Sequence, residues 1–230
     1  DIYTRERGRT TGADGILGIG AQSMALFEAW DPEGYAEHEG IARGANVDPV
    51  TLYTATQMTD MRDALLLSAP LAVAPIPPAD EEGCSALIIP RERTRHGHAI
   101  AGQTWDLNPS DIEFIVAINR RPDTGPETWS VTCAGCLTLV GMNASGLALG
   151  TTNIKTWGAR PGVGYLALLH RMIRCKSARA AATALSAAPR AAAHTFWLAD
   201  PSEQLDLETS PERVVERSSV EGPLCHTNHC

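Results

Sequence analysis

Hydrophobic and polar positions divide the chain into a helical first part, a run of short strands, two further helices and a last group of strands. Apolar residues recur at helical spacing over 51–67, directly after Asp48 and Pro49. Asp caps free amide groups and Pro fits the first turn, so a helix is predicted there. Residues 28–44 are expected to be helix or turn, whereas the glycine-rich stretch 12–20 favours flexible or tightly turning backbone.

The remaining pattern predicts strands and two more helices. Short apolar segments that read as strands occupy 84–90, 98–103, 112–119, 129–132, 137–140, 147–151, 194–198, 204–208 and 214–217. Residues 165–175 and 177–188 read as helices, the second capped by Ser177. Four prolines within 70–80 exclude a helix in that stretch. Strands and helices therefore come in separate runs, which predicts an α+β fold rather than an alternating parallel sheet.

Composition limits the class of protein. The 230 residues are 43% hydrophobic and 20% charged, which is typical of a globular chain with a sizeable core. No apolar run approaches the roughly 18 residues of a membrane span. The net charge is −8 and no basic stripe is present, which argues against nucleic-acid and membrane partners. Six cysteines and no visible secretory leader favour a reducing, cytoplasmic compartment.

The pair Gly83-Cys84 is the most informative candidate for chemistry. It follows the Pro-rich acidic loop, and residues 1–83 carry 14 acidic against 5 basic residues, whereas the rest is nearly neutral. A Cys thiol could attack the preceding Gly carbonyl, which has no side chain to shield it. The product would begin at Cys84, whose α-amine, with a reference pKa of about 7.7–8.0, could serve as base for its own thiol. A buried Cys at an ordinary strand start is the alternative interpretation.

Several motifs favour the chemical interpretation through a family resemblance. The segment E-G-C-S-A-L-I-I-P, followed by G-Q-T-W-D, resembles the nucleophile region of the acyl-coenzyme A:6-aminopenicillanate acyltransferase family. Residues 39–47, the run G-M-N-A-S-G-L-A-L-G-T-T-N and the pair L-D-L-E-T-S-P and C-H-T-N-H resemble further blocks of that family. The resemblance implies a self-processing N-terminal-nucleophile (Ntn) enzyme with an αββα sandwich. It also implies late strands beyond Cys230, so the chain is interpreted as lacking a C-terminal part.

The resemblance also implies roles for individual residues. Cys84 resembles the family's nucleophile and cleavage site, together with Gly83. Asp106 resembles the acid that orients the new amino terminus, and Asn228 resembles the donor to the oxyanion. Asn153 resembles a substrate-facing amide of the wider superfamily. Residues 1–83 would then be a small α subunit or propeptide, and 84–230 the first part of the β subunit.

Metal and redox sites are the main competing interpretations of the cysteines and histidines. Cys133 and Cys136 have redox or ligand spacing, but zinc needs about four ligands and no second pair is placed. Cys225, His226 and His229 alternate along one extended segment, so they cannot all face one ion. His170 is expected in the core or at an interface. The resemblance implies no metal or cofactor.

Two functions from different classes remain open on the sequence. The first is a self-processing Ntn amidase or acyltransferase that takes an acyl group from a linear amide through a Cys84 thioester. Its small-molecule substrate would be an acylated amide, with acyl-coenzyme A or an N-acyl amino acid as examples, and the α and β chains would be mutual partners. The second is an uncleaved relative that acts as a binding or scaffold protein. The substrate and the choice between hydrolysis and acyl transfer are not determined by the sequence.

Overall fold

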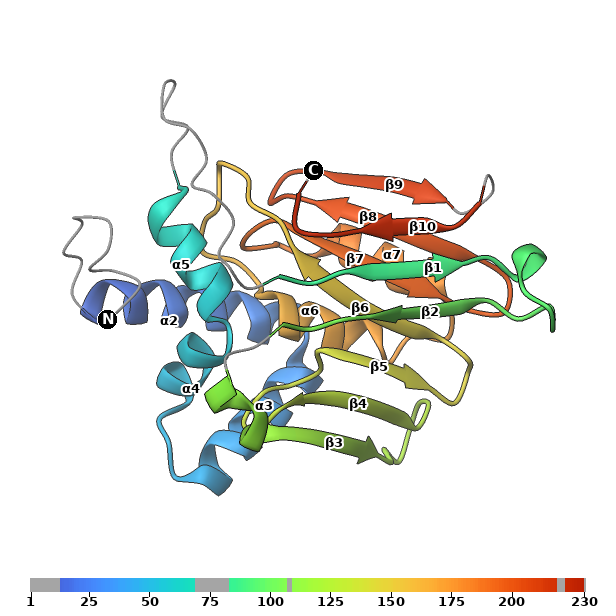
Figure 1. Ribbon diagram of the computed structural model, residues 1–230. Helices are drawn as coiled ribbons and strands as arrows, with labels where there is room; N and C mark the ends of the chain where they lie inside the picture. Colours follow the sequence, from blue (N-terminus) through green and yellow to red (C-terminus); the bar gives the residue numbers. More distant parts are fainter. Residues whose placement is uncertain (1–12, 69–82, 107–108, 219–221, 230) are drawn as a thin grey trace.

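The computed structural model describes residues 13–68, 83–106, 109–218 and 222–229. Figure 1 shows helices gathered at one end of two stacked sheets, with two further helices behind the larger sheet. The α-helices are α2 (Ala13–Trp30), α3 (Pro32–Ala45), α4 (Pro49–Thr56), α5 (Met58–Leu66), α6 (Tyr165–Met172) and α7 (Ala178–Ala187). Two short 3-10 helices are η1 (Arg91–Arg93) and η2 (Pro109–Phe114).

Two antiparallel sheets organise the rest of the described chain. The larger has the order β3-β4-β5-β6-β7-β8-β9, so consecutive strands are neighbours, and the smaller has the order β10-β1-β2. The strands are β1 (Ala86–Ile89), β2 (Ile100–Gln103), β3 (Ile115–Arg120), β4 (Thr128–Cys133), β5 (Val140–Asn143), β6 (Ala148–Asn153), β7 (His194–Ala199), β8 (Gln204–Thr209), β9 (Val214–Ser218) and β10 (Leu224–His226). The smaller sheet thus pairs the beginning and the end of the segment 84–229.

Alternation along β7 explains how the layers are held together. Phe196 and Leu198 are buried in one cluster with the apolar faces of α6 and α7. Trp197 points the other way and packs in a second cluster with Ala86 and Ile88 of β1. The larger sheet therefore carries helices on one face and the smaller sheet on the other, which confirms the predicted α+β class. The second outer helical layer of an αββα sandwich remains a prediction.

The predicted caps at the N-termini of two helices are confirmed. Asp48 caps α4 by accepting a hydrogen bond from the Thr51 amide at 2.8 Å, and Ser177 caps α7 through the Ala180 amide at 3.2 Å. The single helix predicted over 51–67 is wrong in one respect, because it breaks at Gln57 into α4 and α5. The Gln57 side chain instead accepts a hydrogen bond from the Leu166 amide at 3.1 Å, at the start of α6.

The prediction of flexible backbone over 12–20 is also wrong. Residues from Ala13 onward form α2. A Cβ at Gly20 would collide with the Thr54 hydroxyl, so this glycine allows α2 to pack closely on α4. The small residue thus serves helix packing rather than a turn.

Two predicted strands begin later in the structure than the sequence pattern indicates. The strand expected over 112–119 begins only at Ile115, because η2 occupies the residues before it. The one expected over 137–140 begins at Val140. The Pro-rich stretch 70–80 lies outside the described residues.

Candidate active site

The peptide between Gly83 and Cys84 is held where the smaller sheet begins. Strands β1 and β2 pair with Ala86 opposite Gln103. Their hydrogen bonding continues past the strand ends, since the Thr104 amide donates to the Ser85 carbonyl at 2.8 Å. The Asp106 amide likewise donates to the Gly83 carbonyl at 3.0 Å. The carbonyl carbon of Gly83 is therefore fixed in place next to the Cys84 side chain.

Strand β10 brings Asn228 to the other side of Cys84. The antiparallel register sets His226 opposite Ala86, which places residue 228 opposite residue 84. The Cys84 backbone amide donates to Asn228 Oδ1 at 2.5 Å. Asn228 Nδ2 donates in turn to the backbone carbonyl of Asn153 at 2.7 Å, so the carboxamide links the smaller sheet to β6.

Gly83 has polar side chains on two sides. A Cβ at this position would lie 3.0 Å from Asn228 Oδ1 and 3.5 Å from Asp106 Oδ2. The first of these distances is tighter than most real contacts, so a larger residue would push the asparagine away. Cys84, Asp106 and Asn228, which are 144 positions apart at the extremes, thus surround one peptide bond.

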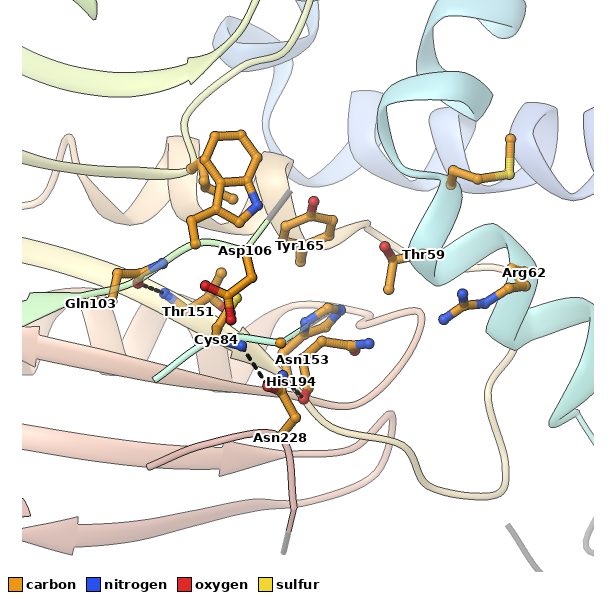
Figure 2. A pocket seen from close by; sticks show the side chains of 14 residues that line it. Thr59, Arg62, Cys84, Gln103, Asp106, Thr151, Asn153, Tyr165, His194 and Asn228 are labelled. Atoms are coloured by element: carbon orange, nitrogen blue, oxygen red, sulfur yellow. Dashed lines mark hydrogen bonds between the residues drawn. The ribbon is translucent and has the colours of Figure 1, made fainter. Parts of the chain in front are cut away.

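A cavity of about 220 Å³ opens in front of this peptide. Figure 2 shows Cys84, Asp106 and Asn228 close together, with Gln103 on one side and His194 on the other. Asn153, the predicted substrate-facing amide, also lines the cavity. The complete lining consists of Met58, Thr59, Arg62, Gly83, Cys84, Gln103, Trp105, Asp106, Leu139, Thr151, Asn153, Tyr165, His194 and Asn228.

The surroundings of the Cys84 thiol favour its protonated form. Burial raises the pKa of the Cys84 thiol above its usual value, and the Asp106 carboxylate acts in the same direction. A hydrogen bond from the Asp106 backbone amide opposes both and lowers that pKa. Attack by this sulfur at neutral pH therefore requires a base that removes its proton.

Sequence comparison places the chain in a family. The sequence model of the acyl-coenzyme A:6-aminopenicillanic acid acyl-transferase family matches residues 93–230, more than half of the chain. The chain belongs to this family. The match begins after Cys84, so the nucleophile assignment rests on the motif around that residue and not on the matched region.

One curated relative and two solved structures give the wider context of this acyl-transferase family member. The chain is 25% identical over 210 residues to the 40 kDa form of acyl-coenzyme A:6-aminopenicillanic-acid-acyltransferase from Emericella nidulans. That alignment covers 90% of this chain and 54% of the relative, so the chain spans about half the relative's length.

Penicillin V acylase from Agrobacterium tumefaciens is similar with a TM-score of 0.36 and 15% identity, covering 61% of this chain and 43% of the acylase. A variant of conjugated bile acid hydrolase from Clostridium perfringens gives a TM-score of 0.35 and 12% identity, covering 66% and 47%. With TM-scores this low, neither likeness adds to the family assignment.

Two groups in the cavity wall were missed by reasoning from the sequence. One is Gln103, inside the G-Q-T-W-D motif. The other is His194 on β7, which lines the cavity and forms a buried pair with Asp60 on α5, joined at 3.1 Å through His194 Nε2. Asp60 also accepts a hydrogen bond from the Tyr165 amide at 2.9 Å, and the Tyr165 ring stacks on His194. No local motif marks this pair, because its members are 134 positions apart.

The other cysteine and histidine candidates have contacts of their own. The Cys136 amide donates to the Cys133 carbonyl at 3.0 Å in a turn, and burial raises the pKa of Cys136 to about 12. His226 contacts Asp206 at 3.2 Å, and this partner raises the pKa of the imidazole. His170 is buried and contacts Glu37 at 3.3 Å.

Metal binding and membrane crossing can be considered for the described part of the chain. There, His, Cys, Asp and Glu side chains form no group of three or more that could hold a metal ion. Among the described helices, none combines the length and apolarity that crossing a membrane requires.

Proposed function

We propose that this family member is a self-processing cysteine enzyme that cleaves or transfers the acyl group of a linear amide through Cys84. The observation that carries the proposal is the Gly83-Cys84 peptide, flanked by Asp106 and Asn228 at the wall of a cavity. A protein that only binds a ligand has no chemical need for a cysteine, a carboxylate and a carboxamide around one half-buried glycine.

This geometry supports a route for self-cleavage. The Cys84 sulfur attacks the Gly83 carbonyl carbon, and the Asp106 amide, already 3.0 Å from the carbonyl oxygen, stabilises the negative charge that develops there. Once the Gly83 carbon is tetrahedral, the Cys84 nitrogen is a basic amine and takes the proton of the thiol, while its N–H donates to Asn228 Oδ1. The carbon–nitrogen bond then breaks and leaves a thioester. Water hydrolyses the thioester to the Gly83 carboxylate and the free Cys84 thiol.

Catalysis would use the new amino terminus. The released Cys84 α-amine, a group whose reference pKa is about 7.7–8.0, takes the proton that the buried thiol must lose. The sulfur attacks the substrate amide, the amine portion leaves with that proton, and an acyl thioester forms. Water or a second amine then removes the acyl group, which gives hydrolysis or transfer. Asp106 would orient the α-amine, and Asn228 would donate to the oxyanion through its remaining N–H.

The family supports an acylated amide as the class of substrate. The Emericella nidulans relative is named for acyl transfer between coenzyme A and 6-aminopenicillanic acid. For this chain we propose the shared chemistry, an acyl group moved from or to nitrogen, with acyl-coenzyme A and N-acyl amino acids as compounds to screen. Residues 1–83 and 84–230 would remain together as α and β chains.

Intact-mass measurement of the purified protein tests the proposal. We expect two pieces, 1–83 and 84–230, and one uncut chain in Cys84→Ala. Cys225→Ala is the matched control, because Cys225 is exposed on β10 and should leave cleavage unchanged. Iodoacetamide should alkylate Cys84 and abolish turnover. An uncut wild-type chain that binds acylated amides without turning them over would instead favour the binding-protein alternative.

A further inference from the structure

Gln103 joins the two sheets through its side-chain oxygen. Its Oε1 accepts hydrogen bonds from the Thr151 amide of β6 at 2.8 Å and from Trp197 Nε1 of β7 at 2.7 Å. Both partners are N–H donors, so this end of the carboxamide must be the oxygen. The orientation of the group is thereby fixed, and the NH₂ end is the free one.

The Gln103 NH₂ group has no acceptor among the described residues. Nε2 is buried and unpartnered, and Gln103 lines the same cavity as Cys84. The β1–β2 register explains the proximity, because Gln103 is opposite Ala86 and Cys84 lies two positions before Ala86, where the hydrogen bonding between the two segments continues. Leaving a buried donor without a partner destabilises the folded chain, so an acceptor from a ligand is expected here.

The surrounding residues leave room for this carboxamide. A Cβ at Gly150 would collide with Gln103 Oε1 and with the Trp197 ring, so glycine on β6 is what admits the side chain. Asn228, the other carboxamide at Cys84, differs in its bonding. Its Nδ2 already donates to the Asn153 carbonyl and its oxygen holds the Cys84 amide.

We infer that Gln103 Nε2 is a catalytic hydrogen-bond donor to the oxyanion that forms on the substrate carbonyl. This inference rests on the proposed Cys84 chemistry. When the sulfur–carbon bond forms, the carbonyl π electrons move to oxygen, and both N–H groups of Gln103 are available to that charge. When the bond to the leaving group breaks, the electrons return and the carbonyl is restored. Because Gln103 Nε2 has no partner before the reaction, no hydrogen bond within the protein is broken when the group donates to the transition state.

Two thiol reagents separate this role from a merely structural one. 4-Nitrophenyl acetate acylates a thiolate through a tetrahedral oxyanion, whereas iodoacetamide alkylates it by direct displacement without one. Both reactions need the Cys84 thiolate, so the ratio of their rates cancels any change in the pKa or exposure of the thiol. Removal of one oxyanion donor slows the first type of reaction by about 10²–10³-fold.

The test compares Gln103→Met, which loses the donor without adding charge, and Gln103→Glu, which keeps an oxygen for Thr151 and Trp197. Gln22→Met on exposed α2 is the matched control. At pH 8 the acylation-to-alkylation ratio should fall about 100-fold in both Gln103 variants and stay at the wild-type value in the control. Peptide mapping confirms that Cys84 carries each adduct.

Three results would count against the inference. A ratio within threefold of wild type in folded Gln103 variants removes Gln103 from the oxyanion site. Equal slowing of both reagents assigns it a structural role only. A wild-type protein that is never acetylated on Cys84 overturns the proposed function itself, which this assay detects without any variant.

Discussion

Two carboxamides in this molecule have opposite hydrogen-bonding states. Asn143, at the turn after β5, uses all four of its bonds within the protein: its oxygen accepts from the Ser145 and Leu147 amides, and its nitrogen donates to the Ile173 and Cys175 carbonyls. Gln103, in the same cavity wall as Cys84, uses only its oxygen and leaves a buried NH₂ unpaired. Side chains of the same chemistry are therefore complete in one region and incomplete in the other.

The difference indicates where a ligand is expected. Asn143 ties the β5–β6 turn to the end of α6, and a complete set of internal partners is typical of a structural residue. Buried polar atoms without partners are gathered in the cavity, since Asn153 Oδ1 and His194 Nδ1 also lack partners there. A folded chain tolerates several such atoms in one place when a bound molecule satisfies them.

The largest expected effect concerns Asn228, which lines the cavity. Asn228→Ala should lower turnover by about a hundredfold or more and change substrate binding little, because the proposed donation strengthens only in the transition state. Asn228→Asp should be at least as harmful, since a carboxylate repels the developing oxyanion. Turnover, substrate affinity and melting temperature are measured on the same processed preparation. Normal turnover in a folded, cleaved variant would remove Asn228 from the site.

Asn143→Ala should lower stability rather than turnover. It leaves two backbone amides and two backbone carbonyls near the β5–β6 turn without partners, so we expect the free energy of unfolding to fall by about 3–4 kcal/mol. Turnover per folded molecule should stay within about twofold of wild type. Urea unfolding and active-site titration give the two values. If the Asn143→Ala variant has normal stability but slow turnover, the number of internal hydrogen bonds does not distinguish a structural carboxamide from a catalytic one.

The sequence predicted which residues meet at the site better than it predicted how they are bonded. Gly83, Cys84, Asp106 and Asn228 stand at strand ends inside recognisable motifs, and the folded chain brings them together. Their catalytic roles stay predictions. Gln103 sits in one of the same motifs, yet its unpaired NH₂ depends on partners 48 and 94 positions away.

The elements of the fold followed a similar rule. Local signals such as the caps at Asp48 and Ser177 predicted helix starts correctly. Errors arose where a distant contact decides the conformation. Gly20 lies within α2 at its close contact with Thr54 of α4, and Gln57 interrupts a helix where its side chain accepts from an amide at the start of α6. The α+β class was predictable because it depends only on the order of elements.

The smallest expected effect concerns the stability of an Asp63 variant. Asp63 is a buried carboxyl that is neither fully hydrogen-bonded like Asn143 nor part of the cavity wall like Gln103. Its Oδ2 is buried without a partner, but the residue is outside the described set that lines the cavity. Burial raises the pKa of Asp63 from 3.8 to about 6; the Arg62 guanidinium opposes this, Asp60 adds to it, and His194 and Lys155 act with Arg62. Below this pKa the buried carboxyl keeps its proton and carries no charge.

The consequence is a defined pH dependence of stability. The folded state holds the Asp63 proton more tightly than the unfolded state, so wild-type stability decreases as pH rises from about 4 through 6. Two pKa units correspond to about 2–3 kcal/mol. Asp63→Asn lacks this loss, so the stability of the variant relative to wild type should rise by that amount between pH 4 and 7.5 in urea unfolding. His226 and Glu37 titrate in both proteins and cancel in the difference. A difference that stays flat across this range would mean that Asp63 ionises normally, and its orphaned oxygen would then need a bound partner as Gln103 does.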